Sequence, residues 1–280
     1  MLIRVKLVYL YVRKIILIFS LLLLALFSRA QDYASLDSLM TGYTIAMQLE
    51  DDEDKCKEVD FMIGTAKDSL VRQHIALWLF DYYKESKVMG EEAVAVHIYD
   101  KWLADGTIKM RGEFDLMDAQ LFANFNRSSL IGMDAPKITL LKPCGGSETI
   151  PVDGKPALLW FYDTGCSKCQ LEAKLLPDVL NKEVDFPIDF YAVYSGQDKK
   201  AWKAFRRSFK LKNRNIRLRH FWDPEIESDY LRLYGVISTP KLYMIDSKGS
   251  IIGRRLEVES LPQILDVAKT IEDYYKSIEK

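Results

Sequence analysis

The pattern of hydrophobic and polar positions divides the chain into three parts. Residues 1–30 carry basic side chains followed by an almost unbroken apolar run. From residue 31 to about residue 132, apolar side chains recur every three or four positions, which is typical of amphipathic helices. Beyond this point, short apolar runs that predict strands alternate with helical patterns. The pattern therefore predicts a leader (1–30), a small all-α domain (31–132) and an α/β domain (133–280).

The leader has the features of a secretory signal peptide. Basic residues precede the apolar run Ile15–Phe27, and the small residues Ser28 and Ala30 take the minus three and minus one positions of a plausible cleavage site. The run is shorter than the roughly 20 residues that span a membrane. We therefore expect a cleaved signal and export to the periplasm or cell envelope. A retained segment that anchors the protein in the membrane is the alternative.

The all-α domain is predicted from the spacing of its apolar positions. Helical faces lie at residues 36–43, 70–83 and 95–102, and a fourth helix is expected over residues 113–125. This part of the sequence contains no group of residues with the spacing of a catalytic or metal site. The sequence therefore does not indicate what this domain does.

The α/β domain is predicted to hold a mixed sheet with helices on both faces, because strands and helices alternate after an initial hairpin. The expected strands are Lys137–Leu141, Thr149–Val152, Ala157–Tyr162, Ile188–Tyr194, Ile216–Phe221, Lys241–Ile245 and Ile251–Leu256. One helix is expected to start near Cys166, and the further helices are Lys199–Phe209, Glu225–Tyr234 and Leu261–Ile278.

The candidate chemistry lies where the buried strand Ala157–Tyr162 gives way to a helix. Cys166 and Cys169 stand three residues apart at this junction, so both lie on one turn and can form a disulfide. Cys166 is nearest the unpaired N–H groups of the helix start, which favour a thiolate. A thiolate attacks disulfides, so Cys166 is expected to attack a substrate and Cys169 to resolve the mixed disulfide.

A structural zinc site is the alternative for this cysteine pair, and it needs two further ligands at suitable spacing. Cys56 and Cys144 stand alone, and the three histidines (His74, His97 and His220) are scattered. We therefore expect redox chemistry with no metal and no cofactor. The sequence leaves open whether Cys56 pairs with Cys144.

Composition and charge narrow the range of partners. The chain is 49% hydrophobic, with 39 Lys and Arg against 40 Asp and Glu, and loss of the basic leader makes the mature protein mildly acidic. No basic tract is interleaved with aromatic residues, so nucleic acid is not an expected partner. The oligomeric state is not indicated.

Three stretches of the α/β domain together resemble the secreted thioredoxin-like thiol-disulfide oxidoreductases of the bacterial envelope (the TlpA/ResA type), a group that includes cytochrome c maturation reductases. The stretches are Met133-Asp134-Ala135-Pro136, Trp160-Phe161-Tyr162 leading to Cys166-Ser167-Lys168-Cys169, and Tyr234-Gly235-Val236-Ile237-Ser238-Thr239-Pro240. The helical first domain is similar to that of Bacteroides-type members. The resemblance implies a thioredoxin-like fold, protein disulfides as substrates and a membrane protein as electron donor.

The resemblance also implies roles for residues outside the cysteine pair. The Thr239–Pro240 bond is expected to be cis, with Pro240 beside Cys166 and an extended edge for a substrate peptide. Thr239 and Gly165 are expected to line the substrate groove. Gly165 stands where plain thioredoxins have a Trp before the first Cys.

Two charged residues of the motif carry predictions of their own. The Lys168 ammonium is expected to favour the Cys166 thiolate, and an exposed lysine with a screened effect is the alternative. Glu172 matches a Glu of the envelope group and is expected to exchange a proton with Cys169, or else to be an exposed helix residue. Plain thioredoxins carry a buried Asp where this chain has Trp160.

The sequence thus favours an exported thiol-disulfide oxidoreductase that reduces or exchanges disulfides in envelope proteins. A thiol peroxidase of the same fold needs a Thr three residues before the reactive Cys, where this chain has Asp163. A non-catalytic binding protein or copper chaperone is the other alternative, although copper delivery in related folds uses a CxxxC and a distant His, for which His220 is the candidate. The direction of electron flow is not indicated.

Overall fold

The computed structural model describes residues 33–278, so the predicted signal peptide lies outside the described residues. These residues divide into two compact units. The first comprises residues 33–87 and 94–120, and the second comprises Val88–Ala93 together with the chain from Leu121 onward. Within residues 33–278, no helix combines the length and the apolar character needed to cross a membrane.

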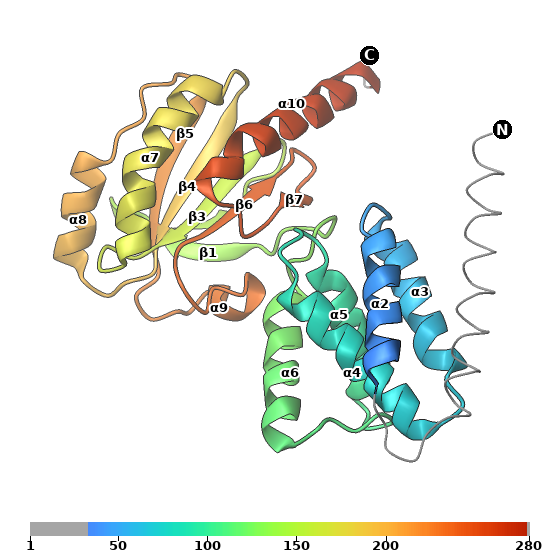
Figure 1. The fold of residues 1–280 in the computed structure, drawn as a ribbon. Helices are drawn as coiled ribbons and strands as arrows, with labels where there is room; N and C mark the ends of the chain where they lie inside the picture. The colour runs from blue at the N-terminus through green and yellow to red at the C-terminus, as the bar shows by residue number, and fades with distance from the viewer. Residues whose placement is uncertain (1–32, 279–280) are drawn as a thin grey trace. The chain divides into compact units, whose positions relative to one another are not determined.

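The first part of the chain is helical (Figure 1). Its elements are α2 (Ala34–Ala46), α3 (Asp52–Thr65), α4 (Ser69–Glu85), α5 (Glu92–Ile98), which runs into a π-helical turn (Tyr99–Leu103), and α6 (Glu113–Asn126). Two aspartates fix helix starts: Asp51 accepts from the Asp54 N–H at 2.8 Å, and Asp68 from the Leu70 N–H at 2.9 Å. Helix α3 was not predicted, because its first two turns are charged and only its later positions are apolar and buried.

The histidines of the helical unit pair with aspartates. His97 contacts Asp60 at 3.0 Å, and Asp60 also accepts from Trp102 Nε1 at 2.8 Å. The His74 ring meets Asp37 at 2.5 Å. Both histidines therefore have structural partners within their own unit.

The second unit contains a seven-stranded mixed sheet in the order β2-β1-β5-β4-β3-β6-β7. The strands are β1 (Ile138–Leu141), β2 (Ser147–Ile150), β3 (Ala157–Tyr162), β4 (Ile188–Tyr194), β5 (Ile216–Trp222), β6 (Lys241–Ile245) and β7 (Ile251–Gly253). The three central strands β3, β4 and β5 are parallel, and the pairs β1–β2, β1–β5, β3–β6 and β6–β7 are antiparallel. Strands β3 and β4 are buried along their whole length because both faces of the sheet are covered there.

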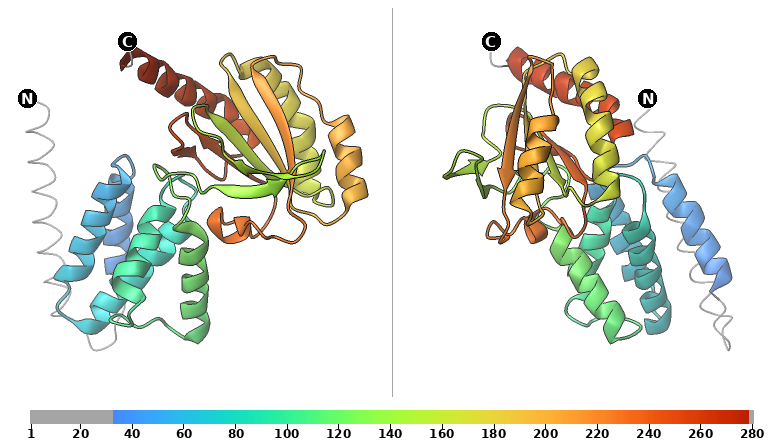
Figure 2. Two further views of the ribbon diagram at one scale, coloured as in Figure 1. Left: turned by 180° about the vertical axis from the view of Figure 1, so that it is seen from behind. Right: turned by 90° about the vertical axis from the view of Figure 1, so that its left-hand side faces the viewer.

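Alternate residues of β3 point into two separate cores. Trp160 and its even-numbered neighbours pack with α7 (Ser167–Glu183), α8 (Lys199–Ser208) and α10 (Leu261–Ile278). Phe161 and its odd-numbered neighbours pack on the other face with Tyr230 and Tyr234 of the segment that holds the short helix α9 (Tyr230–Leu233). Figure 1 looks onto the face covered by α7 and α10, and the view from behind in Figure 2 shows the strands in front of α7.

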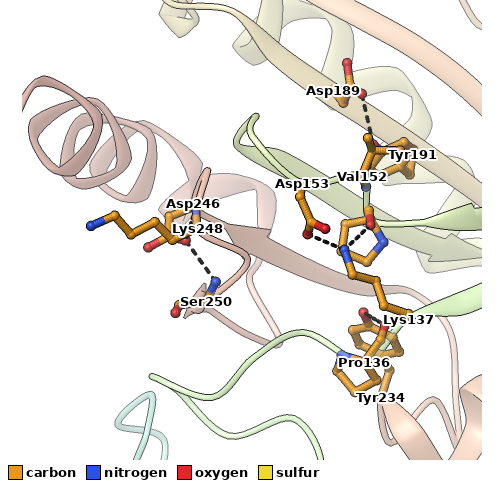
Figure 3. Close-up of polar contacts among 11 residues, drawn as sticks. Pro136, Lys137, Val152, Asp153, Asp189, Tyr191, Tyr234, Asp246, Lys248 and Ser250 are labelled. Atoms are coloured by element: carbon orange, nitrogen blue, oxygen red, sulfur yellow. Dashed lines mark hydrogen bonds and ion pairs between the residues drawn. The ribbon is translucent and has the colours of Figure 1, made fainter. Parts of the chain in front are cut away.

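The hairpin β1–β2 is fastened to the central strand β4 by polar contacts (Figure 3). Lys137 Nζ donates to the Pro151 carbonyl at 2.6 Å and pairs with Asp153. The Val152 N–H donates to the Tyr191 hydroxyl at 3.2 Å, which in turn donates to the buried Asp189 carboxylate at 2.9 Å. These hydrogen bonds attach the turn after β2 to strand β4.

The predicted helix over residues 225–234 is wrong in its extent, since only Tyr230–Leu233 is helical. Asp223 takes the place of a helical hydrogen-bond ladder, because its carboxylate accepts from the N–H groups of Glu227 at 3.0 Å and Ser228 at 2.9 Å. Ile226 has a left-handed backbone with φ 57°. The side-chain contacts therefore favour a turn over the first half of this segment.

The strand expected to reach Leu256 ends at Gly253 instead. Arg254 is fully buried and pairs with Glu92 at 2.6 Å, and it also donates to Asn126 at 3.1 Å. Arg255 has φ 51°. A buried arginine is stable only with polar partners, and the contacts with Glu92 and Asn126 form where the backbone departs from the strand conformation.

Candidate active site

The cysteine pair lies at the junction of β3 and α7. Cys166 is the residue before the helix and its Sγ accepts from the Cys169 N–H at 3.2 Å. The turn that leads into it is held by Asp163, whose carboxylate accepts from the Gly165 N–H at 2.6 Å. The sulfur of Cys166 therefore acts as the N-terminal cap of α7, a position that stabilises negative charge.

The environment of Cys166 favours its thiolate. The residue is partly exposed, and its thiol donates to the Thr239 carbonyl at 3.3 Å. Partial burial acts to raise the pKa of Cys166, but hydrogen bonds from the thiol and the backbone N–H of Cys169 outweigh burial, so that the pKa is lowered from its usual value. These contacts give Cys166 the properties of an accessible nucleophile.

Cys169 has the opposite environment. Its side chain is 2% exposed, and burial raises the pKa of Cys169 to about 12. The Asp163 N–H donates to its Sγ at 3.5 Å. Cys169 therefore stays a neutral thiol near neutral pH until a base takes its proton.

Glu172 lies inside the protein, so the alternative of an exposed helix residue is wrong. Its exposed fraction is 5%, and the Trp160 Nε1–H donates to its carboxylate at 3.0 Å. Burial raises the pKa of Glu172 from its usual value. Glu172 and Cys169 are three residues apart and buried on the same face of α7. A carboxylate with a raised pKa next to a high-pKa thiol has the properties of a proton acceptor.

The remaining predicted site residues are placed as follows. The Thr239–Pro240 bond is cis, and the hydrogen bond at Thr239 brings this segment against Cys166 from 73 residues away. Gly165 is exposed at the turn. Lys168 Nζ contacts Glu257 at 2.9 Å, with both side chains more than half exposed, so the ammonium is engaged with a carboxylate. Its effect on the Cys166 thiolate stays a prediction.

Sequence reasoning missed three residues around the site. Glu257 pairs with Lys168, Lys241 follows Pro240 directly, and Arg255 lies in the segment that leaves β7. The adjacent arginines at 254 and 255 inside a predicted strand were the only signal, since charged residues are rare in a buried strand.

The other titratable candidates lie apart from the pair. His220 is on β5 against the Phe209 ring, and burial followed by the charge of Arg206 lowers the pKa of His220 to about 4. Cys56 and Cys144 are free thiols, and burial raises the pKa of Cys56 to about 12. Among residues 33–278, no group of three or more His, Cys, Asp and Glu side chains is arranged to hold a metal ion.

Comparison with known proteins agrees with this geometry. Residues 147–266 match the family model described as a thioredoxin-like domain. A thioredoxin-like protein from Bacteroides caccae ATCC 43185 superposes with a TM-score of 0.63 at 14% identity, covering 85% of this chain and 85% of its own. That coverage of this chain exceeds the share contributed by residues 121–280, so the likeness in fold extends into the helical part. No match was found among curated proteins.

Two further structures match over about half of this chain. A domain of a possible thiol-disulfide isomerase from Cytophaga hutchinsonii ATCC 33406 is 27% identical, with a TM-score of 0.43, over 55% of this chain and 99% of its own. The thioredoxin domain of a thiol-disulfide oxidoreductase from Bacteroides vulgatus is 24% identical, with a TM-score of 0.42, over 52% of this chain and 99% of its own.

The sheet order, the match of residues 147–266 and the superposition on the Bacteroides caccae structure agree on the fold of the second unit. The chain contains a thioredoxin-like domain preceded by a helical region, which confirms the fold predicted from the sequence.

Proposed function

We propose that this protein is a thiol-disulfide oxidoreductase that reduces or exchanges disulfides in proteins of the cell envelope. The observation that carries the proposal is the difference between two neighbouring thiols. Cys166 is accessible, with a lowered pKa, whereas Cys169 is buried, with a pKa raised to about 12. An attacking thiol needs the first environment, and a resolving thiol that must wait for the mixed disulfide needs the second.

The reaction proceeds in two exchanges. The Cys166 thiolate attacks one sulfur of a substrate disulfide, so that an S–S bond forms to Cys166 and the other substrate sulfur leaves as a thiolate. Cys169 then loses its proton and attacks Cys166 Sγ, which releases the second substrate sulfur as a thiolate. The substrate disulfide gains two electrons, and the cysteine pair ends as a disulfide.

The chain supplies a group for the proton in the second exchange. Glu172 lies one helical turn after Cys169 and is ionised only at a pH above its raised pKa. The Trp160 Nε1–H holds the carboxylate in place at 3.0 Å. Glu172 therefore takes the role of proton acceptor for Cys169 in this proposal.

The cellular setting is part of the same proposal. The basic and apolar leader supports export to the periplasm or envelope. Disulfides persist there, so a reductant needs a supply of electrons from across the membrane. A membrane electron donor that reduces the Cys166–Cys169 disulfide after each turnover completes the cycle.

The test is the reduction potential of the pair, measured in the chain from residue 31 onward by equilibration with dithiothreitol or glutathione buffers. Cys56→Ser with Cys144→Ser is the matched background, since it leaves only the two site thiols. A two-electron titration near about −270 mV, the value of thioredoxin, supports a reductant. A potential of about −120 mV supports an enzyme that forms disulfides instead. If the two thiols do not titrate as a two-electron pair, the proposal that the protein is an oxidoreductase is refuted.

A further inference from the structure

Three segments of the second unit that carry positively charged residues lie next to one another near Cys166. The segment that begins at Thr239 lies between the cysteine turn and the chain after β7, because Thr239 accepts from Cys166 at 3.3 Å and the Leu242 carbonyl accepts from the Leu256 N–H at 3.0 Å. Lys241 is inside this segment. The cations here come from the start of α7, the start of β6 and the loop after β7: Lys168, Lys241, Arg254 and Arg255.

These cations differ in whether a carboxylate neutralises them. Lys168 has Glu257 at 2.9 Å, and Arg254 has Glu92 at 2.6 Å. Arg255 donates to the neutral Asn126 side chain, and it shares the nearby charge of Glu92 with Arg254. The Lys241 ammonium has no hydrogen-bond or ion-pair partner among residues 33–278. Four cations thus face two carboxylates, Glu92 and Glu257, and the excess positive charge belongs to Lys241 and to the Arg254–Arg255 pair.

The surroundings of Lys241 make an anionic ligand favourable. Its side chain is partly buried, and burial followed by nearby positive charges lowers the pKa of Lys241. Those charges belong to Arg255, Lys168 and Arg254. These neighbouring cations repel the Lys241 ammonium, whereas a carboxylate would be attracted by Lys241 and Arg255 together. The attraction would be screened less by water here than on an open surface.

The backbone at Arg255 is unusual as well. Its φ of 51° lies in the left-handed region, which is unfavourable for a residue with a side chain. Strain of this kind persists where the surrounding structure fixes it, and it is concentrated at functional sites. Here it accompanies an arginine with an exposed side chain next to a fully buried one.

We propose that Lys241 and Arg255 form a subsite for a carboxylate side chain next to the disulfide-bonded cysteine of a substrate peptide. This inference rests on the proposed function, because it names the class of disulfide that the same site takes. An Asp or Glu beside the reacting cysteine binds the subsite while its neighbour presents sulfur to Cys166. The enzyme therefore prefers acidic disulfide segments.

The test uses three disulfide-bonded peptides that differ only in the residue after one cysteine, which is Asp, Asn or Lys. The rate at which the reduced protein is oxidised by each peptide is divided by the rate of dithiothreitol with the same peptide, which removes the effect of charge on the peptide disulfide itself. At low salt, the corrected rate for the Asp peptide should exceed that for the Lys peptide about tenfold, and high salt should reduce this ratio.

Variants connect the preference to the subsite. In Lys241→Met with Arg255→Asn, the ratio of Asp to Lys peptide should fall close to one; Met keeps the apolar stem and Asn tolerates the left-handed backbone. Lys203→Gln, at an exposed position of α8, is the matched control and should keep the ratio. Circular dichroism checks that the double variant is folded.

The outcomes separate the subsite from the proposed function. Equal corrected rates for the three peptides in the wild type, or an unchanged ratio in the folded double variant, overturn the subsite and leave the oxidoreductase intact. Failure of the wild type to reduce any of the peptides, while dithiothreitol reduces them all, overturns the proposed function itself.

Discussion

Replacing Glu172 by Gln should slow the second thiol exchange and leave a mixed disulfide on Cys166. Gln has nearly the shape of Glu and keeps an oxygen that accepts the Trp160 Nε1–H, which is 3.0 Å from the carboxylate in the wild type. The substitution removes only the ability to take a proton. It therefore isolates the proposed role of Glu172 from its packing.

The expected size of the effect follows from the environment of Cys169. With a pKa of about 12, this thiol is ionised in about one molecule in 10⁵ at pH 7. The second exchange therefore depends on removal of the proton as the reaction occurs, and a positioned base contributes about 10²- to 10⁴-fold to such a step. We expect Glu172→Gln to slow the second exchange at least about 100-fold.

A symmetric aromatic disulfide that releases a coloured thiol resolves the two exchanges in a stopped-flow experiment. Attack by Cys166 releases the first coloured thiol, and attack by Cys169 on the mixed disulfide releases the second. Glu172→Gln should retain a fast first phase, while the second slows and the mixed disulfide becomes visible by mass spectrometry. Cys169→Ser, which cannot resolve, gives the first phase alone as a reference.

The pH dependence separates proton transfer from a structural effect. In the wild type, the second phase should accelerate as pH rises through the raised pKa of Glu172, because only the ionised carboxylate accepts a proton. The rate of the second phase in Glu172→Gln should not show this increase with pH. If both phases of Glu172→Gln match the wild type in rate and pH profile, Glu172 is not the proton acceptor and the reasoning is refuted.

Three further predictions concern His220, Gly235 and Cys166. The pKa of His220 is about 4 in the folded protein and 6.5 in the unfolded chain, so the unfolded chain binds a proton first as the pH falls. Between pH 6.5 and pH 4, the free energy of unfolding measured with urea should therefore fall by up to about 3 kcal/mol more in the wild type than in His220→Phe. Equal losses in the two proteins would contradict this. Gly235→Ala should lower the free energy of unfolding by at least ~2 kcal/mol, because φ is 58° and a Cβ there would lie 2.2 Å from the Phe125 carbonyl oxygen. An unchanged melting temperature would refute this. Alkylation of Cys166 should reach half its maximal rate at a pH below about 8.5, since its thiolate forms as pH rises through a lowered pKa; a midpoint above that value would refute it.

The strands could be predicted from the sequence where burial on both faces leaves a continuous apolar run. Ala157–Tyr162 and Ile188–Tyr194 were predicted with the limits that the structure confirms, as was the closing helix Leu261–Ile278. Helix α3 was missed because its start is charged. The helix over 225–234 was overpredicted because periodicity carries no information about the Asp223 carboxylate, which replaces the backbone partners of that turn.

For the site, the sequence determines which residues are close along the chain but not which segments meet in space. The spacing of Cys166 and Cys169 on one turn could be read directly. The burial of Glu172 could not, since it depends on the Trp160 ring from a separate strand. The pairing of Lys168 with Glu257 could not be predicted from the sequence either, because 89 residues separate them. The subsite of Lys241 and Arg255 arises only once β6 and the chain after β7 are paired.

The buried pair Arg254–Glu92 has a consequence for protein engineering. A gene fragment cut at the sequence boundary before residue 133 would encode the whole sheet, yet it would omit Glu92, Asn126 and Ser129, all of which contact Arg254. The guanidinium would then lose its counter-charge together with the polar groups that cover it, so the contacts that hold the chain after β7 in place would be lost. Expression boundaries should therefore respect a unit that is discontinuous in sequence, and transfer of the thioredoxin-like unit to another scaffold requires the short segment Val88–Ala93 as well.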